Sequence, residues 1–324
     1  MNEEPFFWEK SSQKKLAYEQ ALNLNYQEFW HKEAQRILWD KKYTKVHDNQ
    51  FANGNWFINA QVNVSVNCLD RHLENNPHKI AIIHENENGT ITKLTYKELH
   101  ELTCDIATML YNRSIMPKDR VAIYMPLNPY AIASMLAVAR IGAIHTVIFA
   151  GFAKDAIIDR VNDCQAKAII TCENMHRRGS EIKLKSIIDE ALKDKRCKSV
   201  QTVLSFDSQE SLLPQDITFK KQQQHPEEIK NPLAFDAQHP LFILYTSGTT
   251  GKPKGIFHAT AGYLVQVTSS MKWVFDLKEN DVYWCSADIG WITGHSYVVY
   301  GPLSLGNTIF LYEGALNYPN QNQI

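Results

Sequence analysis

Short apolar runs alternate with helical segments over much of the sequence, and this rhythm limits the folds that the chain can adopt. The apolar runs lie at residues 81–84, 121–125, 145–149, 166–171 and 200–206. Helical segments are expected at residues 95–113, at 130–141, from about 153 onward, and at 180–194. Strands that are apolar on both faces and separated by helices are typical of a parallel sheet covered on both sides. We therefore predict an α/β fold with mostly parallel sheets, flanking helices and right-handed crossovers.

The same pattern returns after residue 240, with a polar stretch before it. Residues 207–237 lack an apolar period, and we expect a surface connection there. Strands at 241–245, 282–286 and 308–312, a helix from about Ala261 and the segment 294–303 extend the architecture. The strand at 308–312 is apolar on both faces, yet only a short polar stretch follows it. We therefore expect the fold to be incomplete at the C-terminus.

The N-terminal part differs from the rest in its aromatic content. Between residues 15 and 42, aromatic side chains recur at helical spacing: Tyr18, Tyr26, Phe29, Trp30 and Trp39. Such a stripe is typical of amphipathic helices that pack on a larger body. We predict a cap region at residues 1–75 and a main domain at residues 76–324.

Composition and charge narrow the classes of partner. The 34 lysine and arginine residues balance the 35 aspartate and glutamate residues, so no net field attracts nucleic acid or an acidic membrane. We find neither a signal peptide nor an apolar stretch of about 20 residues, and the six cysteines have no CxxC spacing. The twelve histidines have no HxxxH or HxH spacing, and we assign no metal site. We expect a cytoplasmic protein that binds small molecules.

The segment YTSGTTGKPKG, residues 245–255, follows an apolar strand and suits the binding of phosphates. Its amides, hydroxyls and lysines can surround phosphate oxygens. The candidate residues are Thr246, Ser247, Gly248, Thr249, Thr250, Gly251 and Lys252. The spacing differs from that of the common P-loop, because Gly248 and Gly251 are too close and Pro253 follows Lys252. The alternative is a flexible surface loop of low complexity.

The segment 245–255 resembles the signature loop of the adenylate-forming superfamily, and other segments narrow the resemblance. NCLDRHL (67–73), AIYMPL (122–127), ARIGAIHTVIFAGF (139–152) and YWCSADIGWITGHSYVVYGPL (283–303) look like the acetyl-CoA synthetases. The resemblance implies a ligase that makes acetyl-CoA from acetate, CoA and ATP through an acetyl-adenylate, with Mg²⁺ bound to ATP and with AMP and pyrophosphate released. Alternatives are a propionyl-CoA ligase and a non-catalytic remnant that binds nucleotide.

The resemblance also implies positions for the acyl and CoA sites. The acyl pocket corresponds to Trp291, Ile292, Thr293 and Gly294, and the CoA site to Arg177, Arg178, Gly179, Ser180, Thr293 and Asn317. Taken without the resemblance, these are a turn and a solvated basic loop. Ser180 stands at a position that is basic in the family, so Arg178 or Lys183 would have to substitute, and Ala150 replaces a glycine.

The resemblance finally implies which parts of the site lie elsewhere. Acetyl-CoA synthetases continue for about as many residues again, and the family's catalytic lysine would lie beyond Ile324. We assign no catalytic residue to this chain, and we expect the N-terminal half of the large adenylate-forming domain, in a partial or inactive form.

Overall fold

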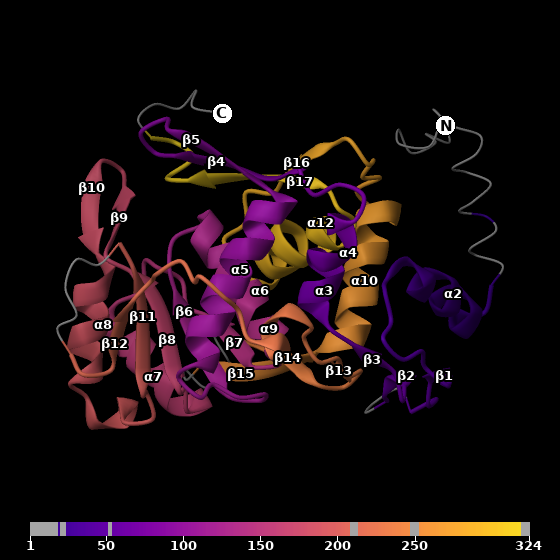
Figure 1. The fold of residues 1–324 in the computed structure, drawn as a ribbon, viewed down its shortest axis with the longest axis horizontal. Helices are drawn as coiled ribbons and strands as arrows, with labels where there is room; N and C mark the ends of the chain where they lie inside the picture. Colours follow the sequence, from indigo (N-terminus) through magenta and orange to yellow (C-terminus); the bar gives the residue numbers. More distant parts are fainter. Residues whose placement is uncertain (1–18, 20–23, 51–53, 208–212, 247–252, 319–324) are drawn as a thin grey trace, which may run out of the picture.

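The computed structural model describes residue 19 and residues 24–50, 54–207, 213–246 and 253–318. Its main body contains two sheets, one of seven strands and one of four, with helices packed between them and around them (Figure 1). Helix α5 (Tyr96–Tyr111) contacts β4 (Ile80–Asn86) and β5 (Ile91–Thr95) of the smaller sheet. Its neighbour α6 (Pro129–Arg140) contacts β6 (Arg120–Tyr124) and β7 (Ile144–Val147) of the larger one. Both sheets therefore share one continuous apolar core.

The larger sheet has the strand order β12-β11-β8-β6-β7-β14-β15. Its strands are β6 (Arg120–Tyr124), β7 (Ile144–Val147), β8 (Ala168–Cys172), β11 (Thr202–Phe206), β12 (Asp216–Thr218), β14 (Pro240–Thr246) and β15 (Lys254–Ala259). All neighbours are parallel except β14 and β15, which run antiparallel. Every residue of β7, β8 and β11 is buried, as expected for strands covered on both faces. The prediction of a mostly parallel α/β fold is confirmed.

The smaller sheet has the order β16-β17-β4-β5. Its strands are β4 (Ile80–Asn86), β5 (Ile91–Thr95), β16 (Val282–Trp284) and β17 (Thr308–Glu313). β16, β17 and β4 are parallel, and β5 returns antiparallel to β4. The strand predicted at 308–312 therefore pairs with one of the first strands of the main domain.

Helices α5, α6, α7 (Lys154–Cys164) and α10 (Thr260–Trp273) begin close to the residues that the sequence predicts. The described helices are α2 (Tyr26–Glu33), α3 (Val64–Cys68), α4 (Asp70–Leu73), α5 (Tyr96–Tyr111), α6 (Pro129–Arg140), α7 (Lys154–Cys164), α8 (Leu184–Leu192), α9 (Glu227–Lys230), α10 (Thr260–Trp273), α11 (Ile292–Gly294) and α12 (Gly301–Ser304). Short 3₁₀ turns span Ala34–Arg36 and Lys195–Cys197, and a π-helix spans His295–Tyr300. Thr95 and Glu98 form a capping box that fixes the start of α5.

Two sequence predictions about local structure are wrong. The helix expected at 180–194 begins only at Leu184, because Ser180–Lys183 form strand β10 and pair with β9 (Asn174–Arg177). The expected surface connection at 207–237 contains β12, which extends the larger sheet, as well as α9 and β13 (Phe235–Asp236). In both places short pairings with a neighbouring strand outweigh the local sequence pattern.

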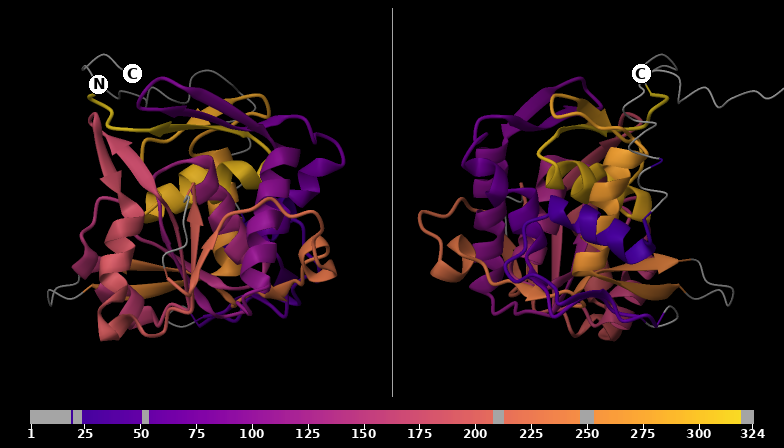
Figure 2. Two further views of the ribbon diagram at one scale, coloured as in Figure 1. Left: turned by 60° about the vertical axis from the view of Figure 1, so that its left-hand side comes forward. Right: turned by 90° about the vertical axis from the view of Figure 1, so that its right-hand side faces the viewer.

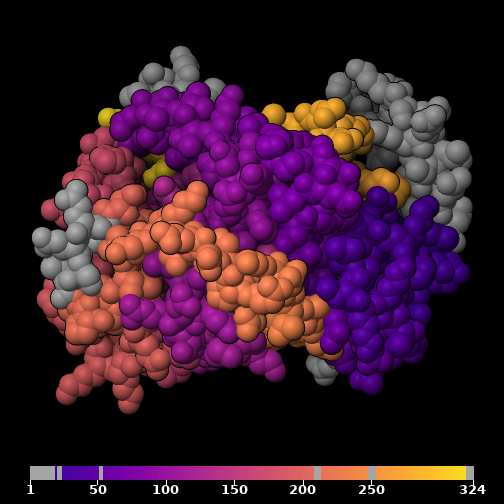
Figure 3. All heavy atoms as spheres, in the orientation of Figure 1, coloured from indigo at the N-terminus to yellow at the C-terminus, as the bar shows by residue number. Residues whose placement is uncertain are grey.

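The N-terminal residues pack beside the main body. β1 (Lys45–His47) pairs with β2 (Trp56–Ile58), and β3 (Gln61–Val62) pairs with β13. The ring of Trp30 on α2 lies 6.0 Å from that of Trp56, and Trp30 and Trp39 pack partly buried against the core. In the space-filling view of Figure 3 these indigo residues form the lower right part of the surface. Tyr18 lies outside the described residues.

One edge strand of each sheet carries exposed apolar side chains. Ile256 and Phe257 on β15 are 48% and 58% exposed, and Val282 and Trp284 on β16 are 56% and 38% exposed.

In the part of the chain that the structure describes, no helix combines the length and the apolar character needed to cross a membrane.

Candidate functional site

The predicted phosphate loop begins at the end of a buried strand. Thr246 is the last residue of β14 and lies exposed opposite Lys254, the first residue of β15. The predicted residues Ser247, Gly248, Thr249, Thr250, Gly251 and Lys252 lie outside the described residues. The strands before and after the loop thus place its two ends at one edge of the larger sheet.

The predicted CoA residues Arg177 to Ser180 form the tip of the β9–β10 hairpin. Arg178 and Gly179 are the two turn residues, and both have a positive φ, 54° and 72°. Two left-handed residues are the mark of a type I′ turn, whose twist suits a tight hairpin. The left view in Figure 2 shows this hairpin, drawn in rose at the left, rising beside the yellow end of the chain. The turn exposes both arginine side chains.

A cavity of about 250 Å³ lies between this hairpin and the end of β17. Its wall brings together three of the predicted CoA residues, Arg177, Arg178 and Asn317. The remaining residues of the wall are Pro126, Leu127, Phe149, Ala150, Met175, His176, Trp284, Ser286, Asp288, Tyr312, Glu313, Gly314, Ala315 and Leu316. Ser180, Thr293 and the predicted acyl residues do not belong to this wall.

The two arginines are held differently. The Arg177 guanidinium lies 5.4 Å from the centre of the Phe149 ring, a cation–π contact. The Arg178 Nη2 donates to Asn317 Oδ1 at 3.3 Å. Burial raises the pKa of Asp288, although the Gly290 amide and the Arg177 charge partly offset this. The cavity wall therefore combines two arginines and an apolar ring with two acids, Asp288 and Glu313. The arginines and the ring suit an anionic ligand with an aromatic or aliphatic part.

The predicted acyl segment lies on the surface, where Trp291 precedes the short helix α11 (Ile292–Gly294). Trp291 and Ile292 are 60% and 43% exposed, and Gly294 is buried. The Asp288 carboxylate accepts the Gly290 amide at 2.7 Å, and the Asp288 carbonyl accepts the Trp291 amide. The two contacts of Asp288 thus fix the backbone just before α11.

Gly294 is required by the space around it. A Cβ at this position would lie 2.1 Å from the Asp288 carbonyl oxygen, which is a backbone atom that cannot rotate away. We expect Gly294→Ala to shift the segment 288–294 and to lower the free energy of unfolding by about 1–3 kcal/mol, as measured by urea denaturation. Gly262→Ala is the matched control. Gly262 lies in helix α10, and a Cβ there would meet only the Trp56 side chain, at 3.6 Å. Equal stability of the two variants would contradict this prediction.

Two imidazoles are buried beneath the acyl segment. His295 and His145 are both 0% exposed, and their rings stack with centres 5.2 Å apart. His295 Nδ1 lies 3.1 Å from the Trp291 carbonyl oxygen, and His145 Nε2 lies 2.5 Å from the Tyr300 hydroxyl. Burial lowers the pKa of His295 to about 3 and that of His145 well below its usual value. Both rings are therefore neutral and support the segment 291–294 from below.

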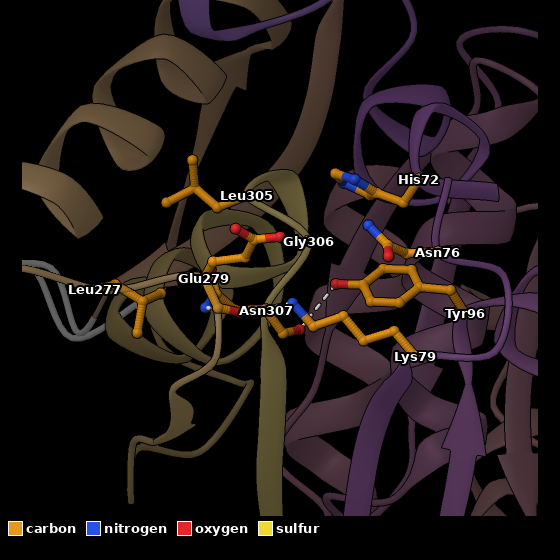
Figure 4. Close-up of a pocket in the computed structure, with 9 residues that line it drawn as sticks. All are labelled: His72, Asn76, Lys79, Tyr96, Leu277, Glu279, Leu305, Gly306 and Asn307. Carbon is orange, nitrogen blue, oxygen red and sulfur yellow. Dashed lines mark hydrogen bonds between the residues drawn. The ribbon is translucent and has the colours of Figure 1, made fainter. Parts of the chain in front are cut away.

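A second cavity, of about 290 Å³, lies next to the starts of β4 and β17, whereas the first cavity lies at the end of β17 (Figure 4). His72, Asn76, Lys79 and Tyr96 face Leu277, Glu279, Leu305, Gly306 and Asn307 across it. The Tyr96 hydroxyl donates to the Asn307 carbonyl at 2.8 Å, and Lys79 Nζ donates to the Glu279 carbonyl at 2.6 Å. These side chains donate to backbone carbonyls on the other wall of the cavity. We therefore interpret the cavity as a packing contact between residues 72–96 and residues 277–307. None of its residues was predicted as a site residue.

One acidic residue beside the first cavity escaped the sequence analysis. Glu87 follows β4 and is 7% exposed, and its carboxylate accepts the amides of Arg178, Gly179 and Ala315. It lies in the polar stretch ENENG, which is typical of a solvated turn.

Among the residues that the structure describes, no group of three or more His, Cys, Asp or Glu side chains could hold a metal ion.

Two family models cover almost the whole chain. Residues 69–323 match the family described as AMP-binding enzyme, and residues 14–68 match the acetyl-coenzyme A synthetase N-terminus. Among the solved structures, the acetoacetyl-CoA synthetase from Streptomyces lividans has a similar fold, with a TM-score of 0.83 and 24% sequence identity. The similarity covers 91% of this chain and 46% of that one.

Curated relatives are more similar in sequence. The acetyl-coenzyme A synthetase of Laribacter hongkongensis is 46% identical over 93% of this chain and 47% of its own length. That of a Marinomonas strain is 44% identical over 95% of this chain and 48% of its own length, and that of Helicobacter acinonychis is 44% identical over 92% and 46%. The chain thus spans about half the length of the curated relatives that it matches.

Proposed function

Because the chain belongs to the AMP-binding enzyme family and begins with the N-terminal segment of acetyl-coenzyme A synthetases, we propose that it provides part of the active site of an acetate–CoA ligase. The overall reaction converts ATP, acetate and CoA to acetyl-CoA, AMP and pyrophosphate. The observation that carries the proposal is the 46% identity to an acetyl-coenzyme A synthetase over 93% of this chain. The division into a cap at 1–75 and a main domain at 76–324 is part of the same proposal.

The phosphate loop is proposed to bind the nucleotide. Thr246, Ser247, Gly248, Thr249, Thr250, Gly251 and Lys252 supply amides, hydroxyls and one cation to the leaving pyrophosphate of ATP. ATP enters as its Mg²⁺ complex. The acetate carboxylate is already ionised and needs no base. Its activation requires that the carboxylate and the α-phosphate of ATP be held in line and that their negative charges be neutralised.

The CoA site is proposed at the hairpin and the cavity beside it. Arg177, Arg178, Gly179, Ser180, Thr293 and Asn317 are the proposed residues. Arg178 takes the place of the missing second basic residue, since its side chain lines the cavity and Ser180 does not. Guanidinium groups bind phosphates through two parallel hydrogen bonds, which suits the phosphates of CoA.

The acyl site is proposed at Trp291, Ile292, Thr293 and Gly294. The exposed faces of Trp291 and Ile292 would form one wall of the pocket for acetate. One methylene more or less in such a wall changes binding by about 1–3 kcal/mol, so the side chain of Ile292 can favour acetate over propionate. Small molecules are the proposed partners and the cytoplasm the proposed location.

Replacing Lys252 tests the nucleotide part of the proposal. We expect the chain to bind a fluorescent ATP analogue, and Lys252→Ala to weaken this binding about 10-fold to 100-fold, because one charge-assisted contact to phosphate is worth roughly 1.5–3 kcal/mol. Lys193→Ala is the matched control, because this lysine is exposed just after α8 and pairs with Glu190. Equal affinity of the wild type and Lys252→Ala would remove the loop from the proposal.

The ligase activity is tested by joining the chain to the second half of the Laribacter relative. We expect this chimera to exchange pyrophosphate into ATP when acetate is present, and to do so faster with acetate than with propionate. A cooperatively folded chimera that binds ATP but gives no exchange with either acid would favour the alternative, a protein that only binds nucleotide. Faster exchange with propionate would favour the propionyl-CoA ligase.

A further inference from the structure

The turn that presents Arg177 and Arg178 is bound by a carboxylate from a distant part of the chain. Glu87 Oε1 accepts the Arg178 amide at 2.7 Å, and Oε2 accepts the Gly179 amide at 2.8 Å. Oε1 also accepts the Ala315 amide at 3.2 Å. One side chain thus joins the hairpin to the segment that follows β17, and residues of both segments line the cavity.

The position of the carboxylate explains why the turn adopts its conformation. A type I′ turn leaves its two central amides pointing outward, where they lack partners within the hairpin. Glu87 binds both of them, one with each oxygen. Burial alone would raise the pKa of Glu87, but the three amide donors outweigh burial and keep its pKa below the usual value. The residue is therefore a charged acceptor.

Neighbouring contacts reinforce the same arrangement. A Cβ on Gly179 would lie 2.3 Å from the Tyr318 hydroxyl, so the turn and the segment 315–318 are closely packed. The Arg178 side chain reaches Asn317 from the same turn. A shift of the turn would therefore move Arg178 away from Asn317 and open the cavity.

We propose that Glu87 is a positioning residue for the CoA site, which fixes the β9–β10 turn so that Arg177 and Arg178 line one cavity with Asn317. It does not touch CoA itself. This inference rests on the proposed function for the identity of the ligand, but the turn that Glu87 holds is a property of the chain alone.

Glu87→Gln is the variant that tests the inference. It keeps the size of the side chain, but it replaces one carboxylate oxygen with an NH₂ group. This group cannot accept a hydrogen bond from the backbone amide of Arg178 or Gly179. We expect hydrogen exchange of the Arg178 and Gly179 amides to become at least about 10-fold faster. We expect CoA to bind about 10-fold more weakly and the fluorescent ATP analogue to bind as tightly as to the wild type. Glu87→Asp retains the charge and should restore part of the CoA affinity.

Glu181→Gln is the matched control. Glu181 lies on β10 of the same hairpin, opposite His176 and exposed, and none of the turn amides donates to it. It should leave both the exchange rates and CoA binding unchanged. Unchanged exchange at Arg178 and Gly179 in Glu87→Gln would overturn the inference. Faster exchange with unaltered CoA affinity would also overturn it, whereas a wild type that does not bind CoA would refute the proposed CoA site itself.

Discussion

Asp70→Ala is expected to lower the free energy of unfolding by about 3–5 kcal/mol, because it leaves a buried guanidinium without its counter-charge. Arg140 is 0% exposed, and its Nη1 and Nη2 each donate to an Asp70 carboxylate oxygen at 2.8 Å. Its Nε also donates to the Ile229 carbonyl at 2.7 Å. The pair therefore joins α4, α6 and α9, which are distant in sequence.

Urea denaturation of the variant and of two comparisons checks this result. Asp70→Leu combined with Arg140→Leu should cost less than the sum of the single changes, because the double variant buries no unpaired charge. Glu190→Ala removes an exposed pair with Lys193 and should leave stability unchanged within error. If Asp70→Ala were no less stable than Glu190→Ala, the buried pair would not have the importance that we assign to it.

Acidification from pH 7 to pH 5 is expected to destabilise the protein through its buried imidazoles. His145 and His295 have folded pKa values below the unfolded value of about 6.5, so the unfolded chain binds protons that the folded chain does not. The contribution of these imidazoles to stability is therefore fully present above about pH 6.5 and is lost as the pH falls. For His295 the loss continues down to about pH 3. Between pH 7 and pH 5, each imidazole lowers the free energy of unfolding by roughly 2 kcal/mol, and the two together by about twice that.

The unfolding free energy measured in urea at pH 7, 6 and 5 checks the sign and the size of this effect. His72, whose pKa burial lowers to about 4, should add to the loss. His100 should offset part of the loss. Burial would lower its pKa, but Asp70 and Cys104 outweigh burial and raise it to about 9, so its stabilising contribution grows as the pH falls through the unfolded value of about 6.5. His78→Gln changes an exposed imidazole and should follow the wild-type curve. A curve that is flat between pH 7 and pH 5 would contradict the prediction.

The strands of the core were predictable because their sequences are apolar on both faces. Runs such as VAIYM and HTVIF have no exposed face in a parallel sheet, so the sequence pattern and the burial agree. The division into two sheets was not predictable in this way. β17 and β4 contain apolar runs like those of the larger sheet, and their pairing with each other depends on tertiary packing.

The candidate site was predictable only in part. The sequence HRRGSEIKLK has charged residues and a helical period, and its strand pairing arises from a type I′ turn at Arg178 and Gly179. An arginine at a left-handed position is uncommon and gives no signal in a single sequence. Glu87 was missed for a related reason, since its partners are backbone amides that any sequence would supply.

The strand order of the smaller sheet has a consequence for synthesis on the ribosome. β4 ends at Asn86, but its parallel neighbour β17 ends at Glu313, roughly 230 residues later. At about 5–20 residues per second, the apolar strand β4 would wait roughly 10–45 s for its partner to be made. We expect the nascent chain to be bound by chaperones during this interval. Of the two sheets, the smaller one is thus completed later, because β17 follows every strand of the larger sheet in the sequence.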